Sequence, residues 1–497
     1  MSELEALYRK LGGGTPARSS TLEGVETLSS SAEMPEEMGS PPPEVLAETA
    51  EPERMTAKEL DDVRAWFESD PEFVTARFGE TVGRTLTPEQ VRAALSQTRI
   101  LLEAPGAGVE LLSAEESLFE AARPLPADFA EKYIAARYRS PAIELKPYDR
   151  RFEDDNFTGL AGWVLWNGLP ALRGLVTKRA FRWHDEYPSR FIYRLEPRSP
   201  EAPLRIALFA DFGTGLTHSL YIARQFEVED FDAAAHLGDV YYTGTKRQYW
   251  EYFETPLAPM VKKGKTKLFL IPENHEGYSG FEGYFYYLDK QRSLHPKTQP
   301  QEGSYFCLQG DRIQLLGIDT IWHSRGRVAK ARVKEWLEGR LEEGRQAGRA
   351  NVLLTGYHPY EYGSDELNEI LTEDLRDIAR RNLIDLWFWG NTHYCALFDR
   401  AARTPFLGSC IGHGGYPYGL RKRSDDGDRP APCPFFEDTP RFPAELGIRD
   451  DRGNNGYAVL TVSPKGDIGL EYIDWMGNRR YQRKLVRKNG ESHLSLE

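Results

Sequence analysis

From Phe191 onward, short apolar runs alternate with longer amphipathic stretches, and this alternation leaves few folds open. The runs "LRIALFAD", "FDAAAHLGD", "TKLFLIPEN", "NVLLTGY" and "IDLWFWG" are each typical of a buried strand, and helical patterns lie between them. Repeated strand–helix–strand order predicts parallel strands covered by helices. The segments "GSYFCLQGDRIQLLGIDT" and "GYAVLTVSPKGDIGLEYIDW" instead predict antiparallel hairpins. The expected fold class is therefore α/β, with mixed β-sheets flanked by helices.

Three segments of different composition divide the chain. Residues 1–55 are mostly rich in Gly, Ser, Pro and Glu, a composition that predicts a disordered arm. Residues 56–190 carry helical patterns such as "TAKELDDVRAWF" and "TPEQVRAALSQTRILLEA", the second with proline at the first helical position. We interpret this second segment as a helical accessory region and residues 191–490 as the α/β domain.

Charge and cysteine content exclude several classes of protein. The 497 residues carry a formal net charge of −13, so binding to a nucleic-acid backbone is not expected. The four cysteines are far apart and show no Cys-x-x-Cys spacing, which argues against a zinc knuckle or a disulfide framework. No apolar stretch is long enough for a membrane span, and the N-terminus lacks the pattern of a signal peptide. The prediction is a soluble, cytoplasmic protein with no membrane partner.

Each of the five apolar strands ends on side chains that can bind metal or move protons. In chain order these are Asp211, Asp239, Asn274 with His275, His358, and Asn391 with His393. Because ligands of α/β sheets bind at the carboxyl ends of the strands, these side chains are expected to converge. Carboxylates, amide oxygens and imidazoles together suit Mn, Fe or Zn.

Each of these residues also has a simpler interpretation. Asp211 stands before a Gly-Thr-Gly turn, where an aspartate commonly caps the following helix. Asp239 fits a turn, and a single histidine after a strand is usually a solvated or structural residue. His236 lies within a strand and is most simply a core histidine. The five strand ends together, rather than any one of them, indicate a site.

The order of these motifs resembles the calcineurin-like metallophosphoesterase superfamily, and within it the purple acid phosphatase pattern. That pattern is Asp-x-Gly, Gly-Asp-x-x-Tyr, Gly-Asn-His-Glu/Asp, a strand end with histidine, and Gly-His-x-His. This chain has "DFG", "GDVYY", "ENHE", "GYHP" and "GNTH" at the corresponding places. The resemblance covers about residues 200 to 475 and leaves the N-terminal 190 residues unexplained.

The resemblance implies a sandwich of two mixed β-sheets and a site for two metal ions, Fe, Mn or Zn. It assigns the first metal to Asp211, Asp239, Tyr242 and His393, and the second to Asp239, Asn274 and His358. It makes His275 the catalytic residue, which donates a hydrogen bond or a proton to the leaving oxygen. The implied reaction is hydrolysis of small phosphomonoesters or phosphodiesters by a hydroxide bound to the dinuclear centre.

Departures from the family pattern concentrate at the second metal. Asn391 stands where the family has the first histidine of Gly-His-x-His, and an amide oxygen is a weaker zinc ligand than imidazole. Tyr357 occupies the usual place of the other histidine, so His358 comes one residue late. Glu273 replaces a glycine and either adds a carboxylate near the metals or faces solvent. Glu276 either orients His275 or lies on the surface.

A second class of function is consistent with these departures. On this alternative, the chain is a catalytically weakened or inactive scaffold of the same fold that binds one metal or a protein partner. The intact motifs favour the enzyme, whereas Asn391 and Tyr357 favour the scaffold. The sequence indicates neither the substrate nor the oligomeric state.

Overall fold

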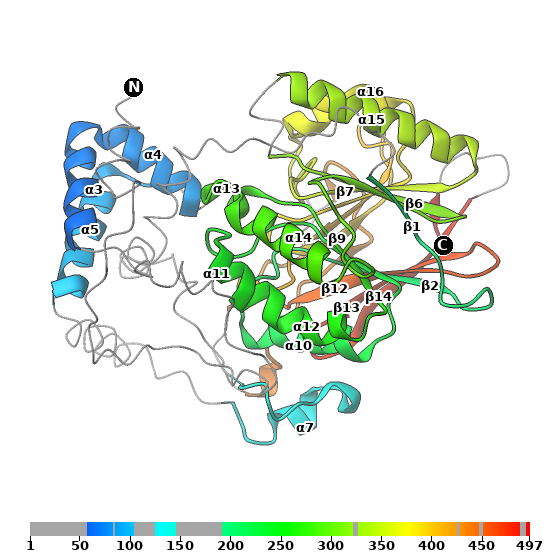
Figure 1. Cartoon of the computed structure of the whole chain (residues 1–497), viewed down its shortest axis with the longest axis horizontal. Helices are drawn as coiled ribbons and strands as arrows, with labels where there is room; N and C mark the ends of the chain where they lie inside the picture. The colour runs from blue at the N-terminus through cyan, green and yellow to red at the C-terminus, as the bar shows by residue number, and fades with distance from the viewer. Residues whose placement is uncertain are drawn as a thin grey trace.

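The computed structural model describes residues 57–82, 85–103, 125–145, 191–321, 327–424, 428–446, 451–487 and 494–497. Its main feature is a pair of mixed β-sheets (Figure 1). The predicted disordered arm, residues 1–55, and the helical pattern "FTGLAGWVLWNGLPALRGLV" lie outside the described residues.

The seven-stranded sheet has the order β15-β14-β13-β12-β2-β3-β4. Its strands β2, β3 and β4 are parallel, and β12 to β15 continue the sheet antiparallel from β2. The bounds are β2 Leu204–Phe209, β3 Ala233–His236, β4 Lys267–Leu270, β12 Gly456–Val462, β13 Ile468–Asp474, β14 Arg479–Val486 and β15 Ser495–Leu496. The predicted hairpin near the C-terminus is confirmed as the β12–β13 pair.

The eight-stranded sheet has the order β1-β5-β6-β7-β8-β10-β9-β11. Strands β6, β7, β8 and β10 run parallel, and β5 pairs with β6 as the predicted hairpin. The bounds are β1 Ile192–Arg194, β5 Phe306–Gln309, β6 Ile313–Ile318, β7 Ala350–Thr355, β8 Leu386–Trp389, β9 Cys395–Phe398, β10 Leu407–Ile411 and β11 Phe435–Phe436. The predicted α/β class with two mixed sheets is confirmed.

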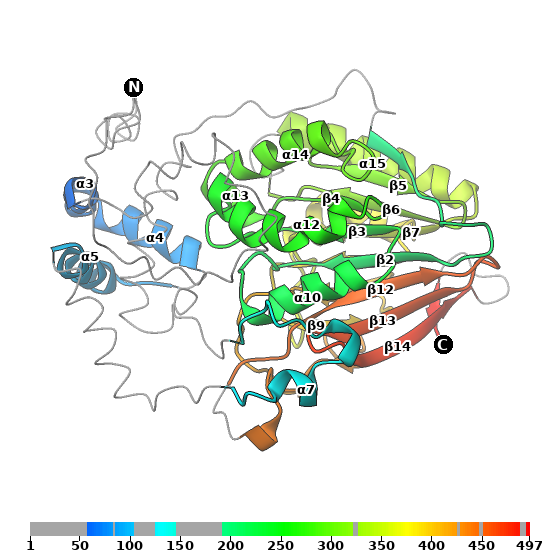
Figure 2. The same ribbon diagram turned by 60° about the horizontal axis from the view of Figure 1, so that its bottom comes forward.

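Helices cover the outer faces of both sheets (Figure 2). On the seven-stranded sheet lie α10 (Thr217–Val228), α12 (Thr255–Lys262) and α14 (Glu282–Leu294), which share one apolar cluster with β2 and β3. The eight-stranded sheet is covered by α15 (Arg327–Gln346), η7 (Ile370–Asp374) and α16 (Arg376–Arg380). A third cluster lies between the sheets, where residues such as Ile206 and Leu354 are fully buried. The result is a four-layer arrangement of helices, sheet, sheet and helices.

The described part of the N-terminal region is helical. Helices α3 (Ala57–Ser69), α4 (Pro71–Val82) and α5 (Pro88–Glu103) contact one another. Further along, α7 (Phe129–Tyr133) and η1 (Ala136–Tyr138) pack on the main domain, where the Phe129 ring stacks on Trp475. No helix within the described ranges is long and apolar enough to cross a membrane.

Candidate active site

Three candidate residues follow the parallel strands of the seven-stranded sheet. Asp211 comes after β2, Asp239 after β3, and Asn274 opens the short helix α13 (Asn274–Tyr278) after β4. The Asp211 backbone N–H donates to the carbonyl of Gly238 at 2.9 Å, which fixes the first two strand ends to each other. Asp211 does not cap α10, because the residue at that N-cap is Leu216. The strand register therefore brings these three residues to one sheet edge.

The eight-stranded sheet adds His393 and Asn391 from the loop after β8. The Asn391 backbone N–H donates to Asp211 Oδ2 at 3.0 Å, and His393 Nε2 lies 3.1 Å from Asp211 Oδ1. Gly390 permits this approach, because a Cβ there would lie 2.8 Å from Asp211 Oδ2. Asp211 is thus the point where the two sheets meet at the site.

Backbone geometry also marks this edge. Asp211, Asp239 and Asn391 have φ angles of 55°, 72° and 61°, in the left-handed region that side chains other than glycine rarely adopt. Aspartate and asparagine tolerate this region better than most residues, at a cost of roughly 1–3 kcal/mol each. Strain of this kind clusters at functional sites, so its presence at three candidate residues supports a functional role for the edge.

A tyrosine hydroxyl joins Asp211 and His393, and it is that of Tyr241. Tyr241 Oη donates to Asp211 Oδ1 at 2.7 Å and lies 3.0 Å from His393 Nε2. The Tyr242 hydroxyl instead lies 3.1 Å from the Tyr416 hydroxyl. The family resemblance assigns Tyr242 to the first metal, and that assignment stays a prediction, whereas the hydroxyl beside Asp211 and His393 is that of Tyr241. The two tyrosines lie in a turn after β3, and of the two hydroxyls it is that of Tyr241 that reaches the pair.

Within the described residues, buried side-chain oxygens of Asp239 and Asn274 have no hydrogen-bond partner. Asp239 Oδ1 accepts from the His275 backbone N–H at 3.1 Å, whereas Oδ2 is unpartnered. Asn274 Nδ2 donates to the Tyr278 hydroxyl at 2.6 Å, and its Oδ1 is likewise unpartnered. Burial, together with the charges of Asp211, Glu276 and Glu273, raises the pKa of Asp239 well above its ordinary value. Buried oxygens without donors are costly unless a cation or ligand satisfies them.

Asp211 differs electrostatically from Asp239. Burial alone would raise its pKa, but the contacts with His393 and Tyr241 and the Asn391 backbone N–H outweigh this and lower the pKa below its ordinary value. Asp211 is therefore the carboxylate of the edge that the protein itself holds in the charged form.

Glu276 is buried and supports the loop that carries Asp239. Its carboxylate accepts the backbone N–H groups of Asp239 at 3.1 Å, Val240 at 2.9 Å and Glu273 at 2.8 Å, and the Tyr249 hydroxyl at 3.0 Å. Burial raises the pKa of Glu276 to about 7. The surface interpretation is wrong, because Glu276 is fully buried, and its contacts hold the loops after β3 and β4 together.

Glu273 is also fully buried, so the solvent-facing interpretation of this residue is wrong. Thr320 Oγ1 donates to its Oε2 at 3.1 Å and accepts the backbone N–H of Tyr357, also at 3.1 Å. Glu273 Oε1 has no partner. Burial and the neighbouring charge of Asp319 raise the pKa of Glu273 well above its usual range. Glu273 thereby links the loop after β4 to Thr320 after β6, and through Thr320 to the loop after β7.

His275 lies beside the two tyrosines. Its Nδ1 is 2.6 Å from the carbonyl oxygen of Tyr242, which requires a proton on Nδ1. Burial lowers the pKa of His275 to about 4. The neutral ring therefore has an unprotonated Nε2, and it becomes a donor there only when a second proton binds.

His358 and Asn391, the two unusual residues of the expected second metal, come together. Asn391 Nδ2 lies 3.5 Å from His358 Nδ1, and Glu361 Oε1 lies 3.5 Å from His358 Nε2. Burial lowers the pKa of His358, which favours the neutral ring with one unprotonated nitrogen. Proximity to Asn391 places His358 next to the site, although its role as a ligand remains a prediction.

The residues present fit a cation site. No group of three histidine, cysteine, aspartate or glutamate side chains in the described ranges is positioned to hold a metal ion by itself. Tyrosine and asparagine oxygens are therefore needed to complete a donor set. The unpartnered oxygens of Asp239 and Asn274, and the close Asp211–Tyr241–His393 group, supply donors of the oxygen and nitrogen type.

The comparison with known families agrees with the motif order. Residues 204–395 match the family model described as calcineurin-like phosphoesterase. Residues 204–395 therefore form a domain of the calcineurin-like metallophosphoesterase superfamily. The matched region of this metallophosphoesterase begins at β2 and ends at Cys395, so it includes all five strand ends. A search of curated proteins found no match.

Several solved structures are similar to this chain at low identity. The anchor protein GAP50 of the Plasmodium inner membrane complex is 14% identical, with a TM-score of 0.46, over 59% of this chain and 91% of that one. A purple acid phosphatase from yellow lupin is 15% identical, with a TM-score of 0.44, over 59% and 55%. PhoD is 12% identical, with a TM-score of 0.41, over 61% and 72%.

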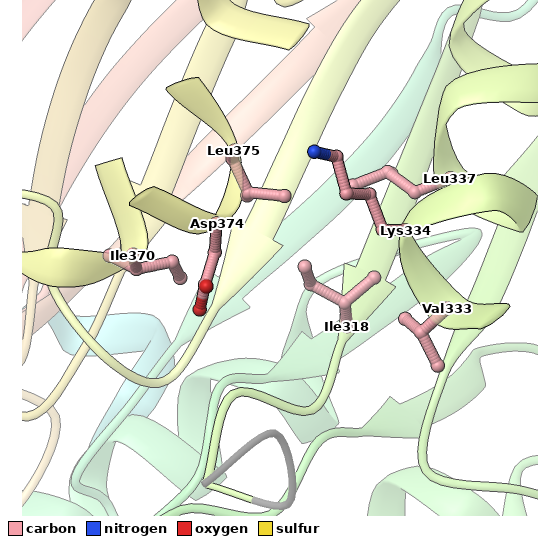
Figure 3. Close-up of a pocket in the computed structure, with 7 residues that line it drawn as sticks. All are labelled: Ile318, Val333, Lys334, Leu337, Ile370, Asp374 and Leu375. Atoms are coloured by element: carbon pink, nitrogen blue, oxygen red, sulfur yellow. The ribbon is translucent and has the colours of Figure 1, made fainter. Parts of the chain in front are cut away.

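We call the loops after β2, β3, β4, β7 and β8 the strand-end edge. A separate apolar pocket lies outside it. Figure 3 shows side chains of α15 facing those around η7 across this pocket. It is lined by Ile318, Val333, Lys334, Leu337, Ile370, Asp374 and Leu375. None of the predicted site residues lines it, so we assign it no role in the chemistry.

Proposed function

We propose that this metallophosphoesterase is an active, metal-dependent hydrolase of phosphomonoesters or phosphodiesters. The observation that carries the proposal is the acid-rich strand-end edge, where Asp239 and Asn274 each present a buried oxygen without a partner. Such oxygens are costly in a folded protein unless a ligand satisfies them. Cations satisfy them, and a negatively charged phosphate then binds to the cations.

The first cation would be held by Asp211, Asp239 and His393 together with a tyrosine. The second would be held by Asp239 and Asn274, with His358 and Asn391 beside them. We propose Fe, Mn or Zn for both places, because the donors are carboxylate, amide and phenol oxygens with imidazole nitrogens. Bound cations supply positive charge that polarises a phosphate ester and acidifies water.

His275 has the protein's own catalytic role in this proposal. Its Nδ1–H is held by the Tyr242 carbonyl, which fixes the ring and leaves Nε2 for the substrate. A bound phosphate carries negative charge and favours protonation of Nε2. The imidazolium can then donate this proton to the leaving oxygen, as general acids do.

The test is hydrolysis of p-nitrophenyl phosphate and bis-p-nitrophenyl phosphate after loading with Mn, Fe or Zn. Asp239→Asn should abolish turnover, since the outer-shell partners of metal ligands alone are worth about 10–100-fold in affinity or activity and a bridging ligand is worth more. Asp311→Asn, at a largely exposed carboxylate, is the matched control and should keep full turnover. Folded protein that turns over neither substrate with any of the three metals would support the non-catalytic scaffold instead.

A further inference from the structure

The hydroxyl of Tyr241 forms a compact group with two predicted ligands of the first cation. The three distances are 2.7 Å to Asp211 Oδ1, 3.0 Å to His393 Nε2, and 3.1 Å between those two atoms. Ligand atoms that each lie about 2.0–2.2 Å from one ion are roughly 3 Å from one another. The three atoms are therefore already spaced as neighbours in one coordination shell.

We propose that Tyr241, and not Tyr242, is the tyrosine ligand of the first cation. This inference rests on the proposed function insofar as that function requires a cation at Asp211 and His393. On binding, the phenol loses its proton to solvent, as other protein ligands do when they bind metals. The hydrogen bond to Asp211 is then replaced by shared coordination, with a carboxylate oxygen, a phenolate oxygen and an imidazole nitrogen on one ion.

The surroundings of Tyr241 fix its ring in this place. Tyr241 is fully buried, and its ring centroid lies 4.4 Å from that of His275 and 4.6 Å from that of Tyr416. A ring held by packing on two others keeps its hydroxyl at Asp211 and His393 without further support.

Tyr242 has a different role in the same loop. Its carbonyl oxygen accepts from His275 Nδ1, and its hydroxyl contacts that of Tyr416. Tyr242 thus positions the catalytic histidine through the main chain. The two adjacent tyrosines therefore have different proposed roles: Tyr241 binds the cation, and Tyr242 orients the imidazole of His275.

The experiment compares Tyr241→Phe with Tyr242→Phe in the full chain loaded with ferric iron. A tyrosinate bound to ferric iron absorbs visible light through charge transfer, and this readout is independent of activity. We expect the wild-type protein to show the band and Tyr242→Phe to keep it. Tyr241→Phe should lose it at equal bound iron, measured by elemental analysis, with circular dichroism as the check of folding.

Three results would overturn the assignment. These are loss of the band in Tyr242→Phe, its retention in Tyr241→Phe, and a wild-type protein that binds no iron or binds it without the band. If Tyr241→Phe fails to fold or loses its iron, Tyr242→Phe and Tyr416→Phe decide. If both of these variants keep the charge-transfer band, Tyr241 is the tyrosine that binds the iron beside Asp211 and His393. Loss of the band in either variant overturns the assignment.

The phosphoesterase proposal is tested separately by the same preparations. Hydrolysis by wild-type protein that binds iron without the band overturns the role of Tyr241 and leaves the proposed function standing. A band that follows Tyr241 in a protein without hydrolysis supports the ligand and overturns the proposed activity.

Discussion

Two buried acidic regions of the domain are built in opposite ways. Asp385 lies just before β8, at the amino end of the strand, and is fully buried. Three guanidinium groups surround it: Arg345 at 3.3 Å, Arg487 at 3.6 Å and Arg400 at 3.9 Å. The backbone N–H groups of Asn351 and Leu494 also donate to its oxygens. Its charge is therefore compensated by the protein itself.

Three carboxyl groups of the strand-end edge lack such compensation by arginine. Asp239, Glu273 and Glu276 are all buried, and in the described part of the chain no arginine or lysine forms an ion pair with them. Backbone N–H groups and hydroxyls satisfy some of their oxygens, but Asp239 Oδ2 and Glu273 Oε1 stay unpartnered. The comparison teaches that the charge of Asp385 stabilises the fold through its arginine partners. The carboxyl groups of the strand-end edge instead remain available to bind a cation.

The largest expected effect is a difference in the free energy of unfolding between two aspartate-to-asparagine variants, one at Asp385 and one at Asp239. Asp385→Asn leaves three guanidinium groups without a carboxylate and should lower the free energy of unfolding by about 3–5 kcal/mol. Asp239→Asn removes an uncompensated buried carboxyl, so the metal-free protein should be equally stable or more stable. Urea denaturation of both metal-free variants measures this. Equal losses at the two positions would show that the strand-end edge is also structural.

Glu276→Gln should have the next largest effect. Glutamine has one acceptor oxygen in place of two, and its amide group would face backbone donors that now point at a carboxylate. We expect the free energy of unfolding to fall by about 1–3 kcal/mol. Cation affinity should fall roughly 10–100-fold because the loop that carries Asp239 is released.

Calorimetric titration with Mn²⁺ separates the two effects of Glu276→Gln. The matched control is Glu471→Gln, at a partly exposed glutamate of β13. Unchanged Mn²⁺ affinity in a destabilised Glu276→Gln protein would restrict Glu276 to a structural role.

The next prediction concerns the pH dependence of the free energy of unfolding and the buried imidazole of His236. His236 lies in β3 beside the rings of Phe209 and Phe253, and neither ring nitrogen has a hydrogen-bond partner among the described residues. Burial lowers its pKa from 6.5 to about 3, against the opposing charge of Asp211. Between these values the unfolded chain binds a proton that the folded chain does not. The free energy of unfolding should therefore fall as pH drops below 6.5, by up to about 1.4 kcal/mol per unit.

Replacing the base checks this assignment. His236→Leu has a similar volume and no titrating group, so the loss of stability between pH 6.5 and pH 4 should be smaller than in wild type. An identical slope in both proteins would show that other groups, such as the buried His218, account for the acid sensitivity.

The sequence predicted the fold and the order of the strand ends well because both depend on local patterns. Apolar runs and turn residues specify strands, and the carboxyl ends of the parallel strands β2 and β8 carry Asp211 and His393, which meet where the two sheets come together. The choice between Tyr241 and Tyr242 depends on the path of one loop, and "GDVYY" offers two adjacent tyrosines with nothing local to separate them. Only the doubled tyrosine could have drawn attention to Tyr241.

The feature least predictable from the sequence was which buried carboxylates are compensated by residues far away in the chain. The three arginines around Asp385 come from positions far apart in the chain, so no spacing in the sequence indicates them. Glu276 was equally hidden, because a glutamate that accepts three backbone N–H groups has the same sequence signature as a surface residue. Which charges are compensated is decided by tertiary packing rather than by local pattern.

The smallest expected effect is that of Asn391→His on metal binding and rate. This variant should strengthen the second cation site and so increase the difference between the strand-end edge and the Asp385 region. Asn391 has a φ of 61°, and histidine is among the residues that tolerate this region, so Asn391→His should fold. An imidazole beside His358 is a better ligand for zinc than an amide oxygen. We expect higher metal stoichiometry and a rate increase of several-fold, about 1 kcal/mol in barrier. Asn391→Gln, which keeps the amide, is the control; no gain from histidine would mean that the donors already present complete the second site.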